Sequence, residues 1–381
     1  MRRAAEQVRR RSLCAGRRLP YRSSNSTRHR GLNVRIVHAS NFSRKAKGAF
    51  QHSVEHKITN GLIRNGHAVS NFSDRDVARS GTLLGHRAFG RRAANRAFAA
   101  FCRSVVPDLV LLGHANALTA ETLSDLRRGL PGLRILQYNV DPLFEPENVA
   151  AILSKIDVVD ATLITTAGDA LRPFYKPGRL VGFVPNPVDL SIETGRCHER
   201  DELPYDLFYA CGNENDPRFV AGRDWTSRDL VAALGAALPR LKMFTPGVGG
   251  APQIAGAKYQ LALESAAIGL NVSKRNDIFL YSSDRLAQLA GNGLAVLIDR
   301  ATGYESLLAE GEFVYFSTFD ELAEKAAKLA GDPAYRRRVA TAGRARYEAL
   351  FNERTVAAYI LDVAFGRCDP LAIPWPSLQT F

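Results

Sequence analysis

Short apolar runs alternate along this chain with longer segments in which apolar residues recur every three or four positions. The first such pair begins after residue 32. A run at 34–39 (VRIVHA) precedes a segment at 49–64, where Phe50, Val54 and Ile58 fall on one side of a helix. Strands that are apolar throughout are typical of a parallel sheet covered on both faces. The pattern therefore predicts an α/β domain.

The alternation runs to residue 184 and starts again after a polar linker. In the first part we expect further strands at 67–72, 109–112, 134–138, 162–165 and 181–184, and helices at 87–105 and 119–128. The linker begins at Pro185-Asn186-Pro187 and ends near Pro204. After it we expect strands at 206–210, 241–245, 268–272, 294–298 and 313–316, and helices at 227–238, 259–266 and 284–291. Two Rossmann-like domains facing a cleft are therefore predicted, at 31–190 and 191–365, with a C-terminal tail at 366–381.

Three closing helices complete the second part, and two of them carry explicit start signals. Thr318 followed by Glu321 is a capping-box pattern. Asp332-Pro333 is an N-cap residue followed by proline in the first turn. These residues fix where the helices should begin.

The positive charge of the chain is concentrated at its start. The 381 residues carry 51 Lys and Arg against 38 Asp and Glu, a formal net charge of +13. Residues 1–30 contribute +9 of it, through ten arginines and one glutamate, which leaves +4 for the rest. Because 1–30 has no apolar run, we expect a disordered basic arm and no secretory signal. Contact with anionic lipid or nucleic acid, an upstream extension and an inert tail are the alternatives; a membrane surface suits the arm better than DNA.

Composition excludes several classes of protein. With 46% hydrophobic and 23% charged residues, the chain is neither disordered nor a disulfide scaffold. Its five cysteines are widely spaced without a CxxC pair, so we expect no zinc site and a reducing, cytoplasmic location. No apolar stretch approaches the ~18 residues of a membrane span, which leaves at most peripheral attachment. No recognisable nucleic-acid-binding module is present, so nucleic acid is not an expected partner.

Polar residues directly follow several predicted strands. Ligands of open α/β sheets bind beyond the carboxyl ends of the strands. The candidates in these positions are His38, Asn41, His114 and Asp141 in the first part, and Asn213, Ser273, Lys274 and Gly303 in the second. His114 and Asp141 are the candidates for proton transfer, because either can accept a proton from a hydroxyl group. A turn at Asp141-Pro142 and a helix cap at His114 are equally good interpretations.

The densest group of candidates lies between residues 269 and 299. A predicted strand ends in Ser273-Lys274, and a loop then leads to Ser282-Ser283 and a helix that begins near Asp284. The serine hydroxyls, the helix start and Arg285 form a diphosphate-type site. The charge of Asp284 would repel phosphate, so we expect this residue to cap the helix or to bind a sugar hydroxyl.

Two further helices carry charged patterns. His52 and His56 lie one turn apart on the first helix, with Glu55 between them, but no third ligand is spaced to complete a metal site, so a solvated helix face is expected. The basic helix combines arginines with phenylalanines, namely Arg87, Arg91, Arg92, Arg96 and Arg103 with Phe89, Phe98 and Phe101. An anionic membrane surface and an ordinary solvated face explain this second pattern equally well.

Residues 259–359 resemble the C-terminal half of CgeB-like glycosyltransferases, within the GT-B superfamily. The residues that carry the resemblance are Gly269-Leu270-Asn271, Ser283, Arg285-Leu286, Gly293, Thr302-Gly303-Tyr304, Glu312, Phe316, Glu321-Leu322, 344–347 and Tyr359. The first part fits more loosely, through 61–62, 65–69, 107–109 and 141–142.

The resemblance implies an α/β protein of GT-B fold that transfers a sugar from a nucleotide-diphosphate sugar to a cell-envelope glycan or glycolipid, without a metal or another cofactor. The first domain would bind the acceptor, with His38 and Asn41 on the acceptor side and Asp141 and His114 as catalytic residues. The donor-binding residues that it implies are Asn213, Arg218, Ser273, Lys274, Ser282, Ser283, Asp284, Arg285, Gln288, Gly303 and Tyr304.

The chain departs from this family at two positions. Many retaining GT-B enzymes carry a pair of glutamates where this sequence has Leu280 and Gln288. The stereochemical course is therefore open. A non-catalytic binding or scaffold protein on a degenerate GT-B fold is the main alternative, and an epimerase of the nucleotide sugar is another.

Overall fold

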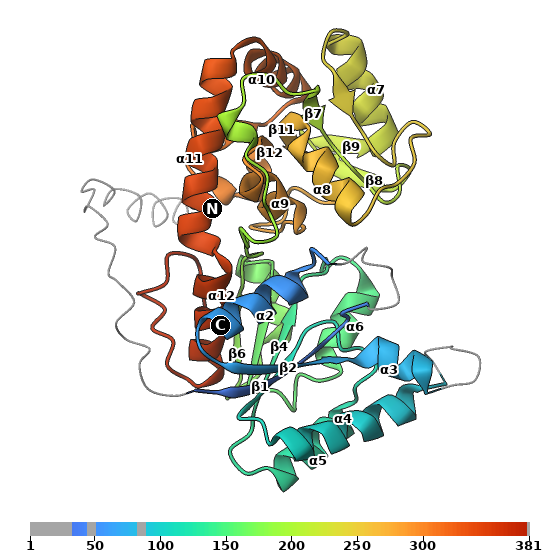
Figure 1. Cartoon of the computed structure of the whole chain (residues 1–381), viewed down its shortest axis with the longest axis vertical. Coiled ribbons are helices and arrows are strands. Elements are labelled where there is room, and N and C mark those ends of the chain that lie inside the picture. The colour runs from blue at the N-terminus through green and yellow to red at the C-terminus, as the bar shows by residue number, and fades with distance from the viewer. Residues whose placement is uncertain (1–32, 44–50, 82–88, 379–381) are drawn as a thin grey trace, which may run out of the picture. The chain divides into compact units, whose positions relative to one another are not determined.

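The computed structural model describes residues 33–43, 51–81 and 89–378. Its first sheet has six parallel strands in the order β2-β1-β3-β4-β5-β6 (Figure 1). The strands are β1 (Arg35–Ser40), β2 (Ala68–Ser73), β3 (Leu109–Leu112), β4 (Arg134–Asn139), β5 (Ala161–Ile164) and β6 (Leu180–Phe183). All six predicted strands of the first part are confirmed, within one or two residues at their ends.

Alternate residues of these strands face two different helix layers. Ile36, Leu109 and Leu111 pack with α2 (Val54–Arg64), whereas Val37 and Val110 pack with the helices on the other face. Those helices are α4 (Arg91–Val105) and α5 (Ala120–Gly129), which lie next to each other (Figure 1). Burial on both sides explains why the strands are apolar throughout.

The second sheet is also parallel, in the order β10-β7-β11-β12-β13. Its strands are β7 (Tyr205–Phe208), β10 (Met243–Phe244), β11 (Ala266–Asn271), β12 (Ala295–Asp299) and β13 (Val314–Phe316). Its helices are α7 (Ser227–Ala237), α8 (Ala257–Glu264), α9 (Arg285–Gly291), α10 (Phe319–Gly331) and α11 (Pro333–Phe351). The predicted second set of strands and helices is confirmed.

Both helix-start signals act as expected. The backbone N–H of Glu321 donates to Thr318 Oγ1 (3.2 Å), and the Glu321 carboxylate accepts from the N–H of Ser317 (2.9 Å). Asp332 Oδ1 accepts from the N–H of Tyr335 (2.8 Å). The side chains thus satisfy backbone donors that a helix start leaves unpaired.

Two helices and two strands of the described part of the chain do not appear in the sequence prediction. They are the short helices α3 (Asp74–Ser80) and α6 (Pro146–Leu153) and an antiparallel hairpin of β8 (Pro217–Val220) and β9 (Arg223–Thr226). The hairpin turns at Ala221-Gly222, both with positive φ (54° and 75°). Asn-Gly or Asp-Gly are the usual signals for such a turn, and an alanine conceals it.

The last helix returns to the first sheet. α12 (Glu353–Ala364) packs on α2, and Gly61 permits the approach, because a Cβ there would lie 2.0 Å from the carbonyl oxygen of Glu353. The predicted 191–365 domain therefore contributes a helix to the other layer. The described part of the tail is also packed: the N–H of Phe183 donates to the Ser377 carbonyl (2.8 Å), and Trp375 is 4% exposed.

Two further observations concern the limits of the described chain. The predicted arm at 1–30 lies outside the described residues. In the described part, no helix combines the length and the apolar character needed to cross a membrane.

Candidate active site

A cavity of 380 Å³ is lined on one side by residues near the first sheet and on the other side by residues near the second sheet. Its lining comes from the ends of the first-sheet strands and the start of α2, and from the starts of α8 and α9 on the opposite side. The residues are Asn41, His52, Ser53, Val54, Glu55, His114, Val140, Ile254, Ala255, Gly256, Tyr259, Asp284 and Gln288. Four predicted site residues, Asn41, His114, Asp284 and Gln288, are brought together there. We call this cavity the cleft.

His114 lies between two carboxylates. Its Nδ1 is 3.0 Å from Glu55 Oε1, and its Nε2 is 3.0 Å from Asp141 Oδ2. Ser40 supports the pair, because its hydroxyl accepts from the N–H of His114 (3.0 Å) and donates to Glu55 (3.2 Å). The Asp141 side chain is 41% exposed and that of Glu55 is 5% exposed, so Asp141 is the member that a substrate can reach.

The two neighbouring carboxylates determine the charge of His114. Burial alone would lower the pKa of His114, but Asp141 and Glu55 outweigh it and raise the pKa to about 10. Burial raises the pKa of Glu55, and the contact with His114 reverses this and lowers it to about 2. His114 is therefore an imidazolium near neutral pH. The proton-acceptor role expected for it does not suit this state, because an imidazolium has no free lone pair.

His38 lies behind the cleft and not in it. It is fully buried, with Nδ1 2.9 Å from Thr59 Oγ1 and Nε2 2.9 Å from the Tyr138 hydroxyl. Burial lowers its pKa to about 4, so the ring is neutral. The structure thus gives His38 a core position in place of the acceptor contact expected from the sequence. Asn41 does line the cleft.

A buried lysine joins the two sides of the cleft. Lys57 of α2 is 0% exposed, and its Nζ lies 2.9 Å from Asp284 Oδ1 and 2.6 Å from Glu193 Oε1. Gln288 donates to Asp284 Oδ2 (2.8 Å) and accepts from the Tyr259 hydroxyl (2.9 Å). The side chain of Asp284 does not cap α9, which was one of the two roles expected for it. It pairs with Lys57 instead.

The cluster of Lys57, Asp284 and Glu193 contains one basic and two acidic side chains. Burial lowers the pKa of Lys57, but the two carboxylates outweigh burial and hold it above its usual value. Burial raises the pKa of both Asp284 and Glu193, and Lys57 offsets only part of that rise. One lysine thus faces the buried carboxylate of Glu193 and the partly exposed carboxylate of Asp284.

The sequence analysis missed the structural importance of Lys57 and of Glu55. Both residues lie on α2, where the apolar stripe of Val54, Ile58 and Leu62 was the only visible signal. The solvated helix face expected around Glu55 is wrong, because Glu55 is 4% exposed and Lys57 is fully buried. Their partners lie on other elements, up to 227 residues away, and no local pattern announces such contacts.

Three predicted donor-binding cations have protein partners in the structure. Arg285 donates to the carbonyls of Val272 (2.7 Å) and Ala210 (2.8 Å), and thereby ties two strand ends together. Lys274 Nζ lies 2.9 Å from Glu145 and 3.2 Å from Asp216, so it connects residues of both parts of the chain. The Arg218 side chain contacts the hydroxyl of Ser227. Of the three, Lys274 is the most exposed and the easiest to redirect to a ligand.

The remaining predicted donor-side residues divide into two with unpaired hydroxyls and several with protein partners. Among the described residues, the buried hydroxyls of Ser273 and Ser283 have no hydrogen-bond partner. Ser282 donates to the Ser283 carbonyl (2.8 Å), and Asn213 contacts Asp216. Tyr304 is 2% exposed and donates to the Leu280 carbonyl (3.0 Å), and Gly303 supplies the left-handed turn before it (φ 74°), so both shape the loop from within.

Comparisons with known proteins bear on the fold of the chain. A family model described as "Glycosyl transferase-like" matches residues 218–362. No curated protein matches the chain in a sequence search. The fold resembles that of a UDP-forming α,α-trehalose-phosphate synthase from Burkholderia xenovorans (TM-score 0.53, 12% identity, 88% of this chain and 99% of that chain).

Two further solved structures are similar over most of the chain. One is Anabaena HepE in complex with UDP and glucose (TM-score 0.53, 11% identity, 88% and 100% of the two chains). The other is the E. coli trehalose-6-phosphate protein bound with UDP-2-fluoro glucose (TM-score 0.54, 13% identity, 87% and 99%). The predicted GT-B fold is thereby confirmed, and the family match is limited to residues 218–362. The CgeB-like subfamily stays a prediction.

Proposed function

We propose that this protein is a glycosyltransferase that moves a sugar from a nucleotide-diphosphate sugar to a cell-envelope glycan or glycolipid, without a metal. The observation that carries the proposal is the cleft, which places His114 opposite the donor-side residues Asp284 and Gln288. The carboxylate of Asp141, 3.0 Å from His114, does not line the cleft itself but is 41% exposed beside it. The similar solved structures include complexes with UDP and with a UDP-sugar analogue, which supports a nucleotide sugar as donor.

Asp141 is the proposed general base. Its carboxylate would accept the proton of the acceptor hydroxyl as that oxygen attacks the sugar carbon. His114, held as an imidazolium by Glu55, would position Asp141 and stabilise its charge before the proton arrives. His114 is thus proposed as a positioning residue.

Lys274, Ser273 and Ser283 are the proposed ligands of the departing diphosphate. The two hydroxyls have no partner among the described residues, and Lys274 is shared by two carboxylates that a diphosphate would displace. α9 has only seven residues, so its helix dipole contributes less here than the sequence analysis assumed. A charge-assisted contact of this kind contributes about 1.5–3 kcal/mol.

Binding of a panel of nucleotide sugars by thermal shift and calorimetry tests the donor site. Lys274→Met should weaken binding of the preferred donor about tenfold or more, since it removes a charged contact. Lys258→Met on α8 is the matched control, because Lys258 is exposed and does not line the cleft. The proposal fails if no nucleotide sugar or nucleoside diphosphate binds, or if both variants behave alike.

A non-catalytic nucleotide-sugar-binding or scaffold protein is the second candidate. Leu280, at one of the two positions where many retaining relatives carry glutamate, is fully buried with a left-handed backbone (φ 55°), and Gln288 carries no charge. This candidate predicts donor binding without any product, whereas an epimerase would isomerise the donor sugar with no acceptor present.

We also propose a cytoplasmic location with peripheral contact to the inner membrane face through the basic arm. The +9 charge of residues 1–30 supports it. Deleting residues 1–30 should weaken binding to phosphatidylglycerol vesicles and leave donor binding unchanged. Equal vesicle binding by the two proteins would refute the arm's role.

A further inference from the structure

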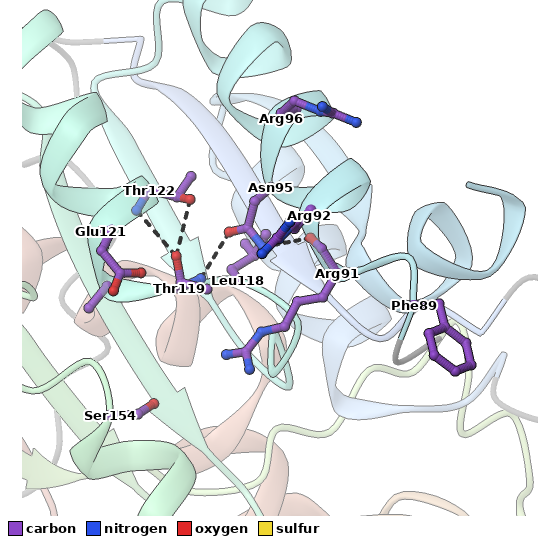
Figure 2. Close-up of a pocket in the computed structure, with 11 residues that line it drawn as sticks. Phe89, Arg91, Arg92, Asn95, Arg96, Leu118, Thr119, Glu121, Thr122 and Ser154 are labelled. Atoms are coloured by element: carbon purple, nitrogen blue, oxygen red, sulfur yellow. Dashed lines mark hydrogen bonds between the residues drawn. The ribbon is translucent and has the colours of Figure 1, made fainter. Parts of the chain in front are cut away.

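A larger cavity lies between α4 and α5 and shares no residue with the cleft. It has a volume of 1020 Å³ and is lined by Phe89, Arg91, Arg92, Asn95, Arg96, Leu118, Thr119, Ala120, Glu121, Thr122 and Ser154. Figure 2 shows the Arg91 side chain extending from the start of α4 toward the segment that contains Thr119. We call this cavity the basic groove.

Positive charge dominates the basic groove. Three arginines line it against a single acidic residue, Glu121. Arg91 donates to the Ala117 carbonyl (3.2 Å) and so also supports the loop after β3. Within the described part of the chain, Arg92 and Arg96 have no carboxylate at ion-pairing distance, and both are exposed. These two arginines are available to an anionic ligand.

A buried lysine lies one residue beyond the basic groove. Lys155 is 5% exposed, and its Nζ donates to the Ala151 carbonyl (3.3 Å). None of the described carboxylates lies within 4.0 Å of it. Burial lowers the pKa of this ammonium to about 8, and the charge of buried Asp74, which is not within 4.0 Å, offsets only part of that change. The fold therefore holds a cation without a direct counter-ion. Such a group is costly to bury unless something pairs with it.

Lys155 lines a second, small cavity beside the catalytic pair. This cavity has a volume of 20 Å³, room for about one water molecule or one functional group. His114, Asn116, Asp141 and Asn148 line it as well. Two chain segments connect it to the basic groove: Ser154 and Lys155 are neighbours, and the loop from His114 to Thr119 borders both cavities.

We propose that the basic groove binds an acidic glycan, the acceptor, whose carboxylate or phosphate groups pair with Arg92 and Arg96 along the groove and with Lys155 in the small cavity beyond it. The proposal rests on the proposed function and adds the acceptor class to it. The acceptor hydroxyl would then reach Asp141 from the side of the small cavity.

The shape and chemistry of the groove favour a glycan chain over a membrane surface. A flat bilayer does not enter a recess, whereas a chain does. Thr122 and Ser154 supply hydroxyl groups that hydrogen-bond sugar hydroxyls, whereas the amide of Asn95 is bound to backbone groups of the protein. Phe89, which is 78% exposed, places an aromatic ring at the groove for contact with the apolar face of a sugar.

The test measures the affinity of the full-length protein for hexagalacturonate, its fully methyl-esterified form and a mannose phosphodiester oligomer. The double variant Arg92→Gln/Arg96→Gln should bind the preferred acidic oligomer at least about tenfold more weakly, since two charged contacts are lost. Arg103→Gln on the same helix is the matched control, because Arg103 is exposed and lies outside the groove. The two acidic probes distinguish carboxylate from phosphate recognition.

Lys155→Met separates binding from folding. Methionine has a similar length and no charge, so the variant should be as stable as wild type or more stable, and yet bind the acidic oligomer several-fold more weakly. A loss of stability with unchanged binding would mean that Lys155 is structural and would overturn its role. Equal binding of the esterified oligomer, or an unchanged affinity in the arginine variant, would overturn the acidic-acceptor proposal.

Two further outcomes distinguish a failure of the acceptor proposal from a failure of the proposed donor site. If nucleotide sugars bind and neither acidic oligomer does, the acceptor proposal falls and the proposed function stands. If the arginine variant loses binding to phosphatidylglycerol vesicles and not to oligosaccharides, the groove is a membrane contact and the acidic-glycan proposal is wrong.

Discussion

Lys57 shows how one residue can hold two parts of the chain together. It is fully buried and pairs with Asp284 and Glu193. Removing one partner of a buried charged cluster leaves the others without compensation, which commonly costs about 3–5 kcal/mol. Lys57→Met should therefore lower the free energy of unfolding by about that amount, measured by urea denaturation. Lys258→Met should change it little, and an equal effect of both variants would contradict the buried ion pairs.

His114 should leave a signature in the pH dependence of stability. Its folded pKa of about 10 lies above its ordinary 6.5, so the stabilisation is complete below pH 6.5 and is lost as the pH rises through 10. The folded pKa of Glu55, about 2, lies below its ordinary 4.5, so that contribution is present above pH 4.5 and is lost as the pH falls through 2. The wild type should exceed His114→Gln in stability most between pH 4.5 and 6.5, in melting curves recorded across pH.

His56 on the same helix provides the control with the opposite sign. Burial lowers its pKa, so whatever it contributes weakens as the pH falls. As the pH falls, the stability of the wild type relative to His56→Gln should therefore decrease. The stability of the wild type relative to His114→Gln should instead increase as the pH falls from 10 to 6.5. Parallel curves for the two variants would show that the charge state assigned to His114 is wrong.

At the scale of elements, the contact between α2 and α12 depends on a glycine. A Cβ at Gly61 would lie 2.0 Å from the Glu353 carbonyl oxygen, a backbone atom that cannot rotate away. Gly61→Ala should destabilise the protein by about 1–3 kcal/mol despite the better helix propensity of alanine. Gly129→Ala, at the end of α5 with nothing within 4 Å of its Cβ, should be neutral or slightly stabilising. Denaturation midpoints of the two variants check this contrast.

Elements were also the scale at which the sequence was most informative. Strands of both sheets follow from uninterrupted apolar runs, and the starts of α10 and α11 follow from Thr318 and Asp332. The β8–β9 hairpin was not predictable in this way, because Ala221 occupies a position with positive φ. The return of α12 to the first sheet is set by tertiary packing, and the sequence around 353–364 looks like any amphipathic helix.

The site was predictable only in part, for a related reason. The rule that ligands bind at the carboxyl ends of parallel strands led to Asn41, His114 and Asp141. It does not distinguish residues that line the cleft from those that support it. His38 follows the same rule and is buried. Glu55 and Lys57 lie on a helix and gain their charge partners only through the fold.

For the molecule as a whole, the central claim is that the cleft binds a nucleotide sugar and that Asp141 assists its transfer. The charge of +13 does not by itself suggest this, since most of it belongs to residues 1–30. In the described residues, three arginines gather in the basic groove against one acidic residue. The proposed function therefore depends on the positions of individual charged residues and not on the net charge of the chain.

The most direct measurement is nucleoside diphosphate release, followed by mass spectrometry, from a nucleotide-sugar panel with an acidic cell-envelope glycan as acceptor. We expect wild type to release the diphosphate and to add one sugar mass to the glycan. Asp141→Asn should slow this about 100-fold to 10,000-fold, the usual range for a general base, while donor affinity is retained. Release by Asp141→Asn at the wild-type rate, or no release and no donor binding by wild type, would contradict the account.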